Sequence, residues 1–160
     1  MKVLAVDPGY DRLGLAVIEK KNNTEELLYS ECYQTHSSDE FYTRIKQIGV
    51  QVRELITEYQ PDAMAIEELF FAKNTKTALK VSESRGVVIF QALDADIPIY
   101  EYTPNQIKVA VTGYGKATKN DIHSMVRRLI NLGDSKKIDD EIDAIATGLT
   151  FFASYRDYNK

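Results

Sequence analysis

The sequence has few of the residue types that would place it in a specialised class. Its 160 residues include one cysteine, Cys32, and no tryptophan. A single cysteine can form neither an internal disulfide nor a thiolate-only metal site, so we expect a reducing compartment. No apolar run approaches the ~20 residues that a membrane span requires, and Met1 leads directly into a strand-like stretch without a signal peptide. We therefore expect a cytoplasmic protein that has no membrane contact.

The overall composition is that of an ordinary globular protein. Hydrophobic residues make up 44% and charged residues 28% of the chain, which excludes disordered and fibrous classes. At about 100–200 residues per domain, the length predicts one domain spanning residues 1–160.

Charge is distributed unevenly along the chain. The net charge of −4 argues mildly against a nucleic-acid partner, but residues 73–137 hold eleven Lys and Arg against six Asp and Glu. A positive middle between acidic ends can make one face attractive to phosphate. Chance patterning of the surface is the simpler alternative.

Hydrophobic spacing predicts an α/β fold. Three strands joined by short polar turns indicate an antiparallel meander, and the later strands alternate with helices, which indicates parallel pairing. We expect a five-stranded mixed sheet flanked by helices, with Ser38 or Asp39 capping the first helix and a Thr118–Asp121 capping box on a later one. The predicted strands cover residues 3–6, 13–18, 27–34, 63–66 and 99–102; the predicted helices cover 41–59, 78–92, a short segment from 104, a segment after 118, and 139–155.

Two predicted strands end in carboxylates. Asp7 precedes a Pro-Gly turn, and Glu67 and Glu68 follow an apolar run. Open α/β sheets bind ligands at this carboxyl edge, although an Asp before Pro-Gly is also a common turn residue. Since neighbouring strand residues face opposite sides, the pattern alone does not choose between Glu67 and Glu68.

A third acidic cluster opens the last predicted helix. Asp140 and Asp143, three residues apart, share one helical face, and Asp139 adds a further charge. The helix dipole also favours acidic residues in a first turn, which is the simpler explanation. Oxygen-only ligands without a Cys or His set suit Mg²⁺ or Mn²⁺. We expect His123 to be a surface residue rather than a base.

These residues resemble the RuvC family of Holliday junction resolvases. The matching stretches occur in the family's order and spacing across essentially the whole chain. The resemblance implies a ribonuclease H-like fold with four catalytic, metal-binding positions, which fall on Asp7, Glu67, Asp140 and Asp143. The matching stretches are residues 7–9, 13–14, 65–74, 78–80, 85–87 and 140–146.

The resemblance also implies an activity and its partners. It implies a homodimeric endonuclease that resolves four-way DNA junctions in recombination, repair or phage DNA processing. Each active site would use two Mg²⁺ ions, with Mn²⁺ able to substitute. The sequence does not show whether a helicase takes part. The dimer surface is expected on the second helix, whose stripe of small apolar residues could equally pack on the sheet: Ala78, Val81, Val88 and Ala92.

Further residues are expected to contact DNA. Lys108 and Lys119 match basic positions that the family places near the scissile phosphate. Phe70 matches an aromatic that sits against bases, since stacking tolerates any sequence. The remaining DNA-binding residues that we predict are Lys73, Lys76, Lys80 and Arg85.

Two readings from other classes remain open. The first is a module of the same fold that binds branched DNA without cutting it. The second is an actin-like phosphotransfer ATPase or sugar kinase, which also opens with a strand ending in Asp-x-Gly. Such enzymes need two domains and glycine-rich phosphate loops, which 160 residues do not supply.

Overall fold

The computed structural model describes residues 1–69, 75–133 and 137–155. Its centre is a five-stranded sheet in the order β3-β2-β1-β4-β5. β1, β2 and β3 pair antiparallel, whereas β4 and β5 run parallel to β1, which confirms the predicted mixed sheet. The strands are β1 (Lys2–Asp7), β2 (Arg12–Lys21), β3 (Thr24–Gln34), β4 (Ala63–Glu67) and β5 (Ile99–Tyr102).

The hairpin between β2 and β3 extends further than the apolar pattern predicts. Asn22 and Asn23 have φ values of 49° and 62°, so the two strands turn over two residues. Asparagine tolerates this left-handed conformation, and such a turn matches the twist of the flanking strands. The polar residues on either side therefore continue the sheet instead of forming a loop.

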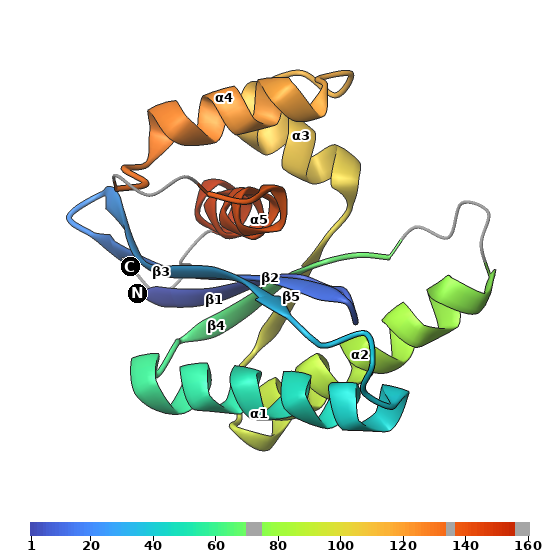
Figure 1. Cartoon of the computed structure of the whole chain (residues 1–160). Coiled ribbons are helices and arrows are strands. Elements are labelled where there is room, and N and C mark those ends of the chain that lie inside the picture. The colour runs from blue at the N-terminus through green and yellow to red at the C-terminus, as the bar shows by residue number, and fades with distance from the viewer. Residues whose placement is uncertain (70–74, 134–136, 156–160) are drawn as a thin grey trace.

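Helices cover both faces of the sheet (Figure 1). α1 (Phe41–Tyr59) and α2 (Thr75–Asp94) lie on one face. α5 (Asp139–Ser154) lies on the other face and is itself covered by α3 (Pro104–Thr112) and α4 (Lys119–Leu129). No helix among the described residues combines the length and hydropathy needed to cross a bilayer.

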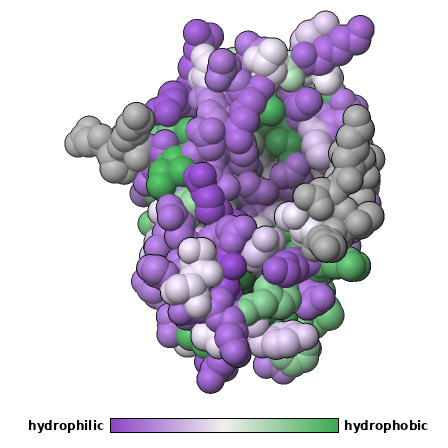
Figure 2. All heavy atoms as spheres, turned by 45° about the vertical axis from the view of Figure 1, so that its right-hand side comes forward, coloured by the Kyte–Doolittle hydropathy of each residue, from purple (hydrophilic) through white to green (hydrophobic). Residues whose placement is uncertain are grey.

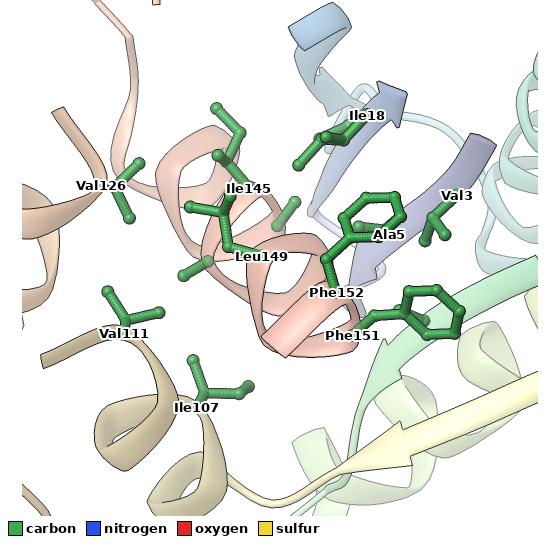
Figure 3. Packing of buried hydrophobic residues seen from close by; sticks show 14 of the residues in the cluster. Val3, Ala5, Ile18, Ile107, Val111, Val126, Ile145, Leu149, Phe151 and Phe152 are labelled. Carbon is green, nitrogen blue, oxygen red and sulfur yellow. The ribbon is translucent and has the colours of Figure 1, made fainter. Parts of the chain in front are cut away.

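Two hydrophobic cores separate the layers. In β1, Val3 and Ala5 face α5, while Leu4 and Val6 face α1 and α2, as the two-residue period of a strand requires. α5 is buried over most of its length between the sheet and the α3–α4 pair (Figure 3). α5 therefore has little freedom to move relative to β1, which matters for the site described below.

The helix caps agree with the sequence in one case and differ in another. The predicted capping box on α4 is confirmed: the Thr118 amide donates to Asp121 at 2.8 Å. The predicted cap of α1 by Ser38 or Asp39 is wrong. The N-cap is Glu40, without a side-chain hydrogen bond, because Ser38 bonds His36 and Asp39 accepts from Gln47 at 3.0 Å.

Candidate active site

Asp7 and Glu67 end two neighbouring parallel strands. β1 and β4 pair in register up to Val6 and Ile66, so the next residue of each strand lies at the same level of the sheet edge. The two carboxyl groups lie close enough for the charge of Glu67 to raise the pKa of Asp7. Parallel pairing thus brings together two carboxylates that lie 60 positions apart in the sequence.

The first turn of α5 reaches the same edge because Gly14 leaves room for it. Gly14 lies opposite Asp7 in the β1–β2 pair. A Cβ atom at Gly14 would lie 2.1 Å from the Asp140 carbonyl oxygen and 3.0 Å from the Asp7 Cβ. Real Cβ atoms essentially never show a contact as short as the first, and the second is already tight, so glycine is what allows α5 to approach here. β1, β4 and α5 then contribute Asp7, Glu67, Asp140 and Asp143 to one locus.

The carboxylates at this locus disturb one another's ionisation. Burial raises the pKa of Asp7 well above its usual value, and the charges of Glu67, Asp143 and Asp140 raise it further. Burial and the charge of Asp143 likewise raise the pKa of Glu67. Perturbed carboxylates gathered in this way are typical of functional sites. They mark a place where excess negative charge favours a bound cation.

Two side-chain cations hold the carboxylates of α5. The Lys119 Nζ lies 2.8 Å from Asp143 Oδ2, and Arg12 forms an ion pair with Asp140. Burial alone would lower the pKa of Lys119, but its hydrogen bond to Asp143 and the surrounding acidic charges raise it. The sequence analysis missed Arg12, because the local pattern of β2 does not show that the Arg12 side chain lies near α5.

His123 also belongs to this locus, and its expected surface position is wrong. Its ring is 15% exposed, and Nε2 lies 3.3 Å from Asp143 Oδ1. The other ring nitrogen lies 3.8 Å from an oxygen of Asp139. α4 presents Lys119 and His123 one turn apart toward α5, a juxtaposition that depends on how the two helices pack.

A pocket of ≈ 200 Å³ opens between the carboxylates and α3 and α4. Hydrophilic side chains predominate on the face of the molecule that Figure 2 shows. The pocket brings the predicted basic residues Lys108 and Lys119 together with Glu67 and Asp143. Its apolar lining residues are Pro104, Ile107, Ile122 and Ala146.

The structure distinguishes the two adjacent acidic pairs. Glu67 lines the pocket, whereas Glu68 is exposed and its amide donates to the Tyr102 carbonyl at 2.8 Å. Asp140 affects the ionisation of Asp7, whereas Asp139 is 65% exposed at the rim. Glu67 and Asp140 are therefore the better placed members of the two pairs.

The predicted DNA-binding residues are only partly visible. Phe70 and Lys73 lie outside the described residues, as does the side chain of Lys76. The Lys80 ammonium lies over the rings of Tyr10 and Phe41, at 5.5 and 5.2 Å from their centroids.

Arg85 has partners within the protein. It forms an ion pair with Glu101 at 2.5 Å, and its Nε donates to the Glu67 carbonyl at 3.4 Å. Its role as a DNA contact stays a prediction.

The donor chemistry of the locus fits hard divalent cations. All four acidic groups supply oxygen, the ligand type that Mg²⁺ and Mn²⁺ prefer. Burial and the neighbouring carboxylates raise the pKa values of Asp7 and Glu67, and a bound cation would favour their charged forms. No three acidic, His or Cys side chains of the described residues are already arranged around a common metal position. Asp140 and Asp143 are instead held by Arg12 and Lys119.

Comparisons with known proteins agree with this geometry. The family model for crossover junction endodeoxyribonuclease RuvC matches residues 3–151. The chain is 46% identical over 147 residues to the crossover junction endodeoxyribonuclease RuvC of Petrotoga mobilis, covering 92% of this chain and 90% of that protein. The corresponding protein of Halothermothrix orenii is 43% identical, with coverages of 98% and 94%.

Solved structures give the same result. Thermus thermophilus RuvC in complex with a Holliday junction substrate superimposes with a TM-score of 0.89 and 34% identity, covering 95% of this chain and 93% of that one. The yeast mitochondrial resolvase Ydc2 shares the fold, with a TM-score of 0.70 at 13% identity over 94% of this chain and 77% of that one. The chain belongs to the RuvC family of crossover junction endodeoxyribonucleases.

Proposed function

We propose that this protein cuts four-way DNA junctions by metal-dependent hydrolysis of phosphodiester bonds, in recombination and repair. The observation that carries the proposal is the convergence of four carboxylates from β1, β4 and α5, two of which have raised pKa values because they are buried together. A protein gains no stability from crowding carboxylates in this way. Their retention is explained by a site that binds cations.

Asp7, Glu67, Asp140 and Asp143 would hold the metal. Nucleases of the RuvC family are metal-dependent, and we propose two Mg²⁺ ions per site, which Mn²⁺ can replace. Bound divalent ions supply a polarised water as the nucleophile and stabilise the leaving oxygen. The protein contributes the rigid placement of the carboxylates, since β1 and β4 are paired in register and α5 is buried against them.

Lys108 and Lys119 would neutralise the DNA phosphate. Both line the pocket beside Glu67 and Asp143, Lys108 from α3 and Lys119 from α4. A positive charge aimed at a phosphate stabilises the negative charge that develops in the transition state. When a phosphate enters, Lys119 can exchange its hydrogen bond with Asp143 for one to a phosphate oxygen.

A non-cleaving junction-binding module is the alternative of the same fold. It has no need of four converging carboxylates, so the geometry does not favour it. The hypothesis of an actin-like phosphotransfer enzyme is also not favoured, because the RuvC family model matches residues 3–151.

Cleavage of a labelled four-way junction tests the proposal. We expect symmetric nicks in the presence of Mg²⁺ and none in EDTA, and we expect Asp143→Asn to bind the junction without cutting it. Junctions that are retarded but stay intact at every Mg²⁺ concentration would establish the non-cleaving alternative. A linear duplex of the same sequence is the control for structure selectivity.

We propose that α2 supplies the dimer surface, on a face different from the predicted stripe. Val88 and Ala92 are fully buried in the core between the sheet, α1 and α2, so they are not available to a partner. The opposite face of α2 instead exposes Leu79, Phe90 and Leu93, at 65%, 58% and 60%. Exposed apolar residues grouped in this way mark interaction surfaces. Two-fold pairing of this face would give one active site for each strand to be cut.

Analytical ultracentrifugation tests the α2 surface. Phe90→Glu should shift the protein toward monomer, because it places a charge in the apolar contact. Val109→Glu, at a hydrophobic residue of α3 that is 46% exposed, is the matched control and should leave the dimer intact. Equal dimerisation of both variants would place the interface elsewhere.

Residues 1–160 are proposed to form one nuclease domain, because both hydrophobic cores pack against the same sheet. The free thiol of Cys32 supports the proposal that the protein acts in the reducing cytoplasm.

A further inference from the structure

The carboxylate of Asp143 is held from α4 at both of its oxygens. Lys119 Nζ lies 2.8 Å from Oδ2, and His123 Nε2 lies 3.3 Å from Oδ1. Lys119 and His123 are four residues apart, so they extend from the same face of α4 toward α5. The proposed function can release Lys119 to the DNA phosphate, and His123 is then the group that still orients Asp143.

Burial suits His123 to this role. Its ring is 15% exposed in the α4–α5 contact, whereas the Lys119 side chain is 54% exposed. A ring enclosed in this way cannot turn freely. Nδ1 lies 3.8 Å from Asp139, beyond hydrogen-bonding distance, so the contact with Asp143 selects the tautomer in which Nε2 carries the hydrogen.

We infer that His123 is a positioning residue for metal binding, whose Nε2–H donates to Asp143 and holds the carboxylate toward the cluster. The inference rests on the proposed function, since it takes Asp143 to be a metal ligand. Groups that orient metal ligands typically contribute 10–100-fold to metal affinity or activity. His123 acts through Asp143 and is not assigned any contact with the DNA.

The two amide replacements of histidine provide a sharp test. Glutamine can place its amide N–H near the position of Nε2, whereas the shorter asparagine can place it only near Nδ1, which faces Asp139. We expect His123→Gln to bind Mn²⁺ close to the wild-type affinity, and His123→Asn and His123→Leu to bind it 10–100-fold more weakly. Mn²⁺ binding is measured by electron paramagnetic resonance on the whole protein without DNA.

Cleavage separates positioning from a general loss of structure. In His123→Asn, the Mg²⁺ concentration for half-maximal cutting should rise by the same factor as the Mn²⁺ dissociation constant, and cutting at saturating Mg²⁺ should recover. Junction binding in EDTA should not change. A loss of structure would instead lower the unfolding temperature and junction binding together, and it would not distinguish asparagine from glutamine.

Three outcomes would overturn the inference. Wild-type Mn²⁺ affinity in His123→Asn and His123→Leu would show that the contact does not orient Asp143. Equal loss of Mn²⁺ affinity in His123→Gln and His123→Asn, with the unfolding temperature and junction binding in EDTA unchanged, would show that the imidazole itself is required, as a direct ligand. If Asp143→Asn binds Mn²⁺ and cuts like the wild type, the proposed site has failed; if only the His123 variants behave normally, the positioning role alone has failed.

Discussion

Replacing Gly14 by alanine tests whether the approach of α5 to β2 builds the active site. The new Cβ would lie 2.1 Å from the Asp140 carbonyl oxygen, 2.8 Å from the carbonyl carbon and 3.0 Å from the Asp7 Cβ. Ordinary carbon–oxygen contacts are about 3.3–3.6 Å, so the first turn of α5 must retreat by roughly 1.2–1.5 Å. The obstructing atoms are backbone, which cannot rotate away as the end of a side chain could.

The retreat should affect the reaction more than the fold. Overpacking of this kind costs about 1–3 kcal/mol, and a protein of this size loses roughly 2–4 °C per kcal/mol. We therefore expect the melting temperature to fall by about 2–12 °C. A displacement of ~1 Å in an active site can slow the reaction ~100-fold, so cutting should nearly disappear while most molecules remain folded.

The assay is single-turnover junction cleavage well below the melting temperature of the variant, with thermal unfolding measured in parallel. Gly86→Ala is the control for unfolding, because no atom of the same chain lies within 4 Å of a Cβ at this site in α2; since Gly86 lies on the proposed dimer face, both proteins are compared at the same concentration and their dimerisation is measured. It should stabilise the protein by about 0.5–1 kcal/mol, as alanine does in a helix. Wild-type cutting by Gly14→Ala, at any melting temperature, would refute the view that Gly14 positions α5 for catalysis.

Three further outcomes follow from the carboxylates. Because the pKa of Asp7 is raised in the folded state, its contribution to stability is present below its unfolded pKa and is lost as the pH rises through the folded value. In EDTA, Asp7→Asn should therefore unfold at a higher temperature than the wild type at pH 8, and its unfolding temperature should depend less on pH. An equal pH dependence in both proteins would contradict burial and neighbouring charge as the cause of the raised pKa. Glu67→Gln should abolish cutting while Glu68→Gln cuts normally, as gel analysis of nicked junctions would show; the reverse result would mean that the wrong residue of β4 has been assigned. Mg²⁺ at a hundred times its dissociation constant should add about 2.7 kcal/mol to the free energy of unfolding of the wild type, measured by denaturant titration, and an equal gain in Asp7→Asn would place the metal elsewhere.

Local patterns were sufficient for much of the architecture. Apolar runs and helical spacing predict the strands and helices, because period-two and period-3.6 patterns depend only on nearby residues. The position of Asp7 and Glu67 at strand ends follows from the same patterns. Resemblance to the RuvC family added the assignment of Asp140 and Asp143 as site residues. The acidic first turn of a helix does not by itself identify them, because the helix dipole also favours acidic residues there.

The tertiary structure alone decided which distant side chains meet. Arg12 lies beside Asp140 and His123 beside Asp143, although no spacing in the sequence reports either contact. Gly14 has an ordinary negative φ, so its importance comes from the backbone of α5 and not from its own conformation. Such contacts depend on how the helices pack against the sheet. Local periodicity shows which face of a helix is buried, but not where the helix lies on the sheet. The sequence therefore determined the elements and their carboxylates, while close packing determined which residues hold those carboxylates in position.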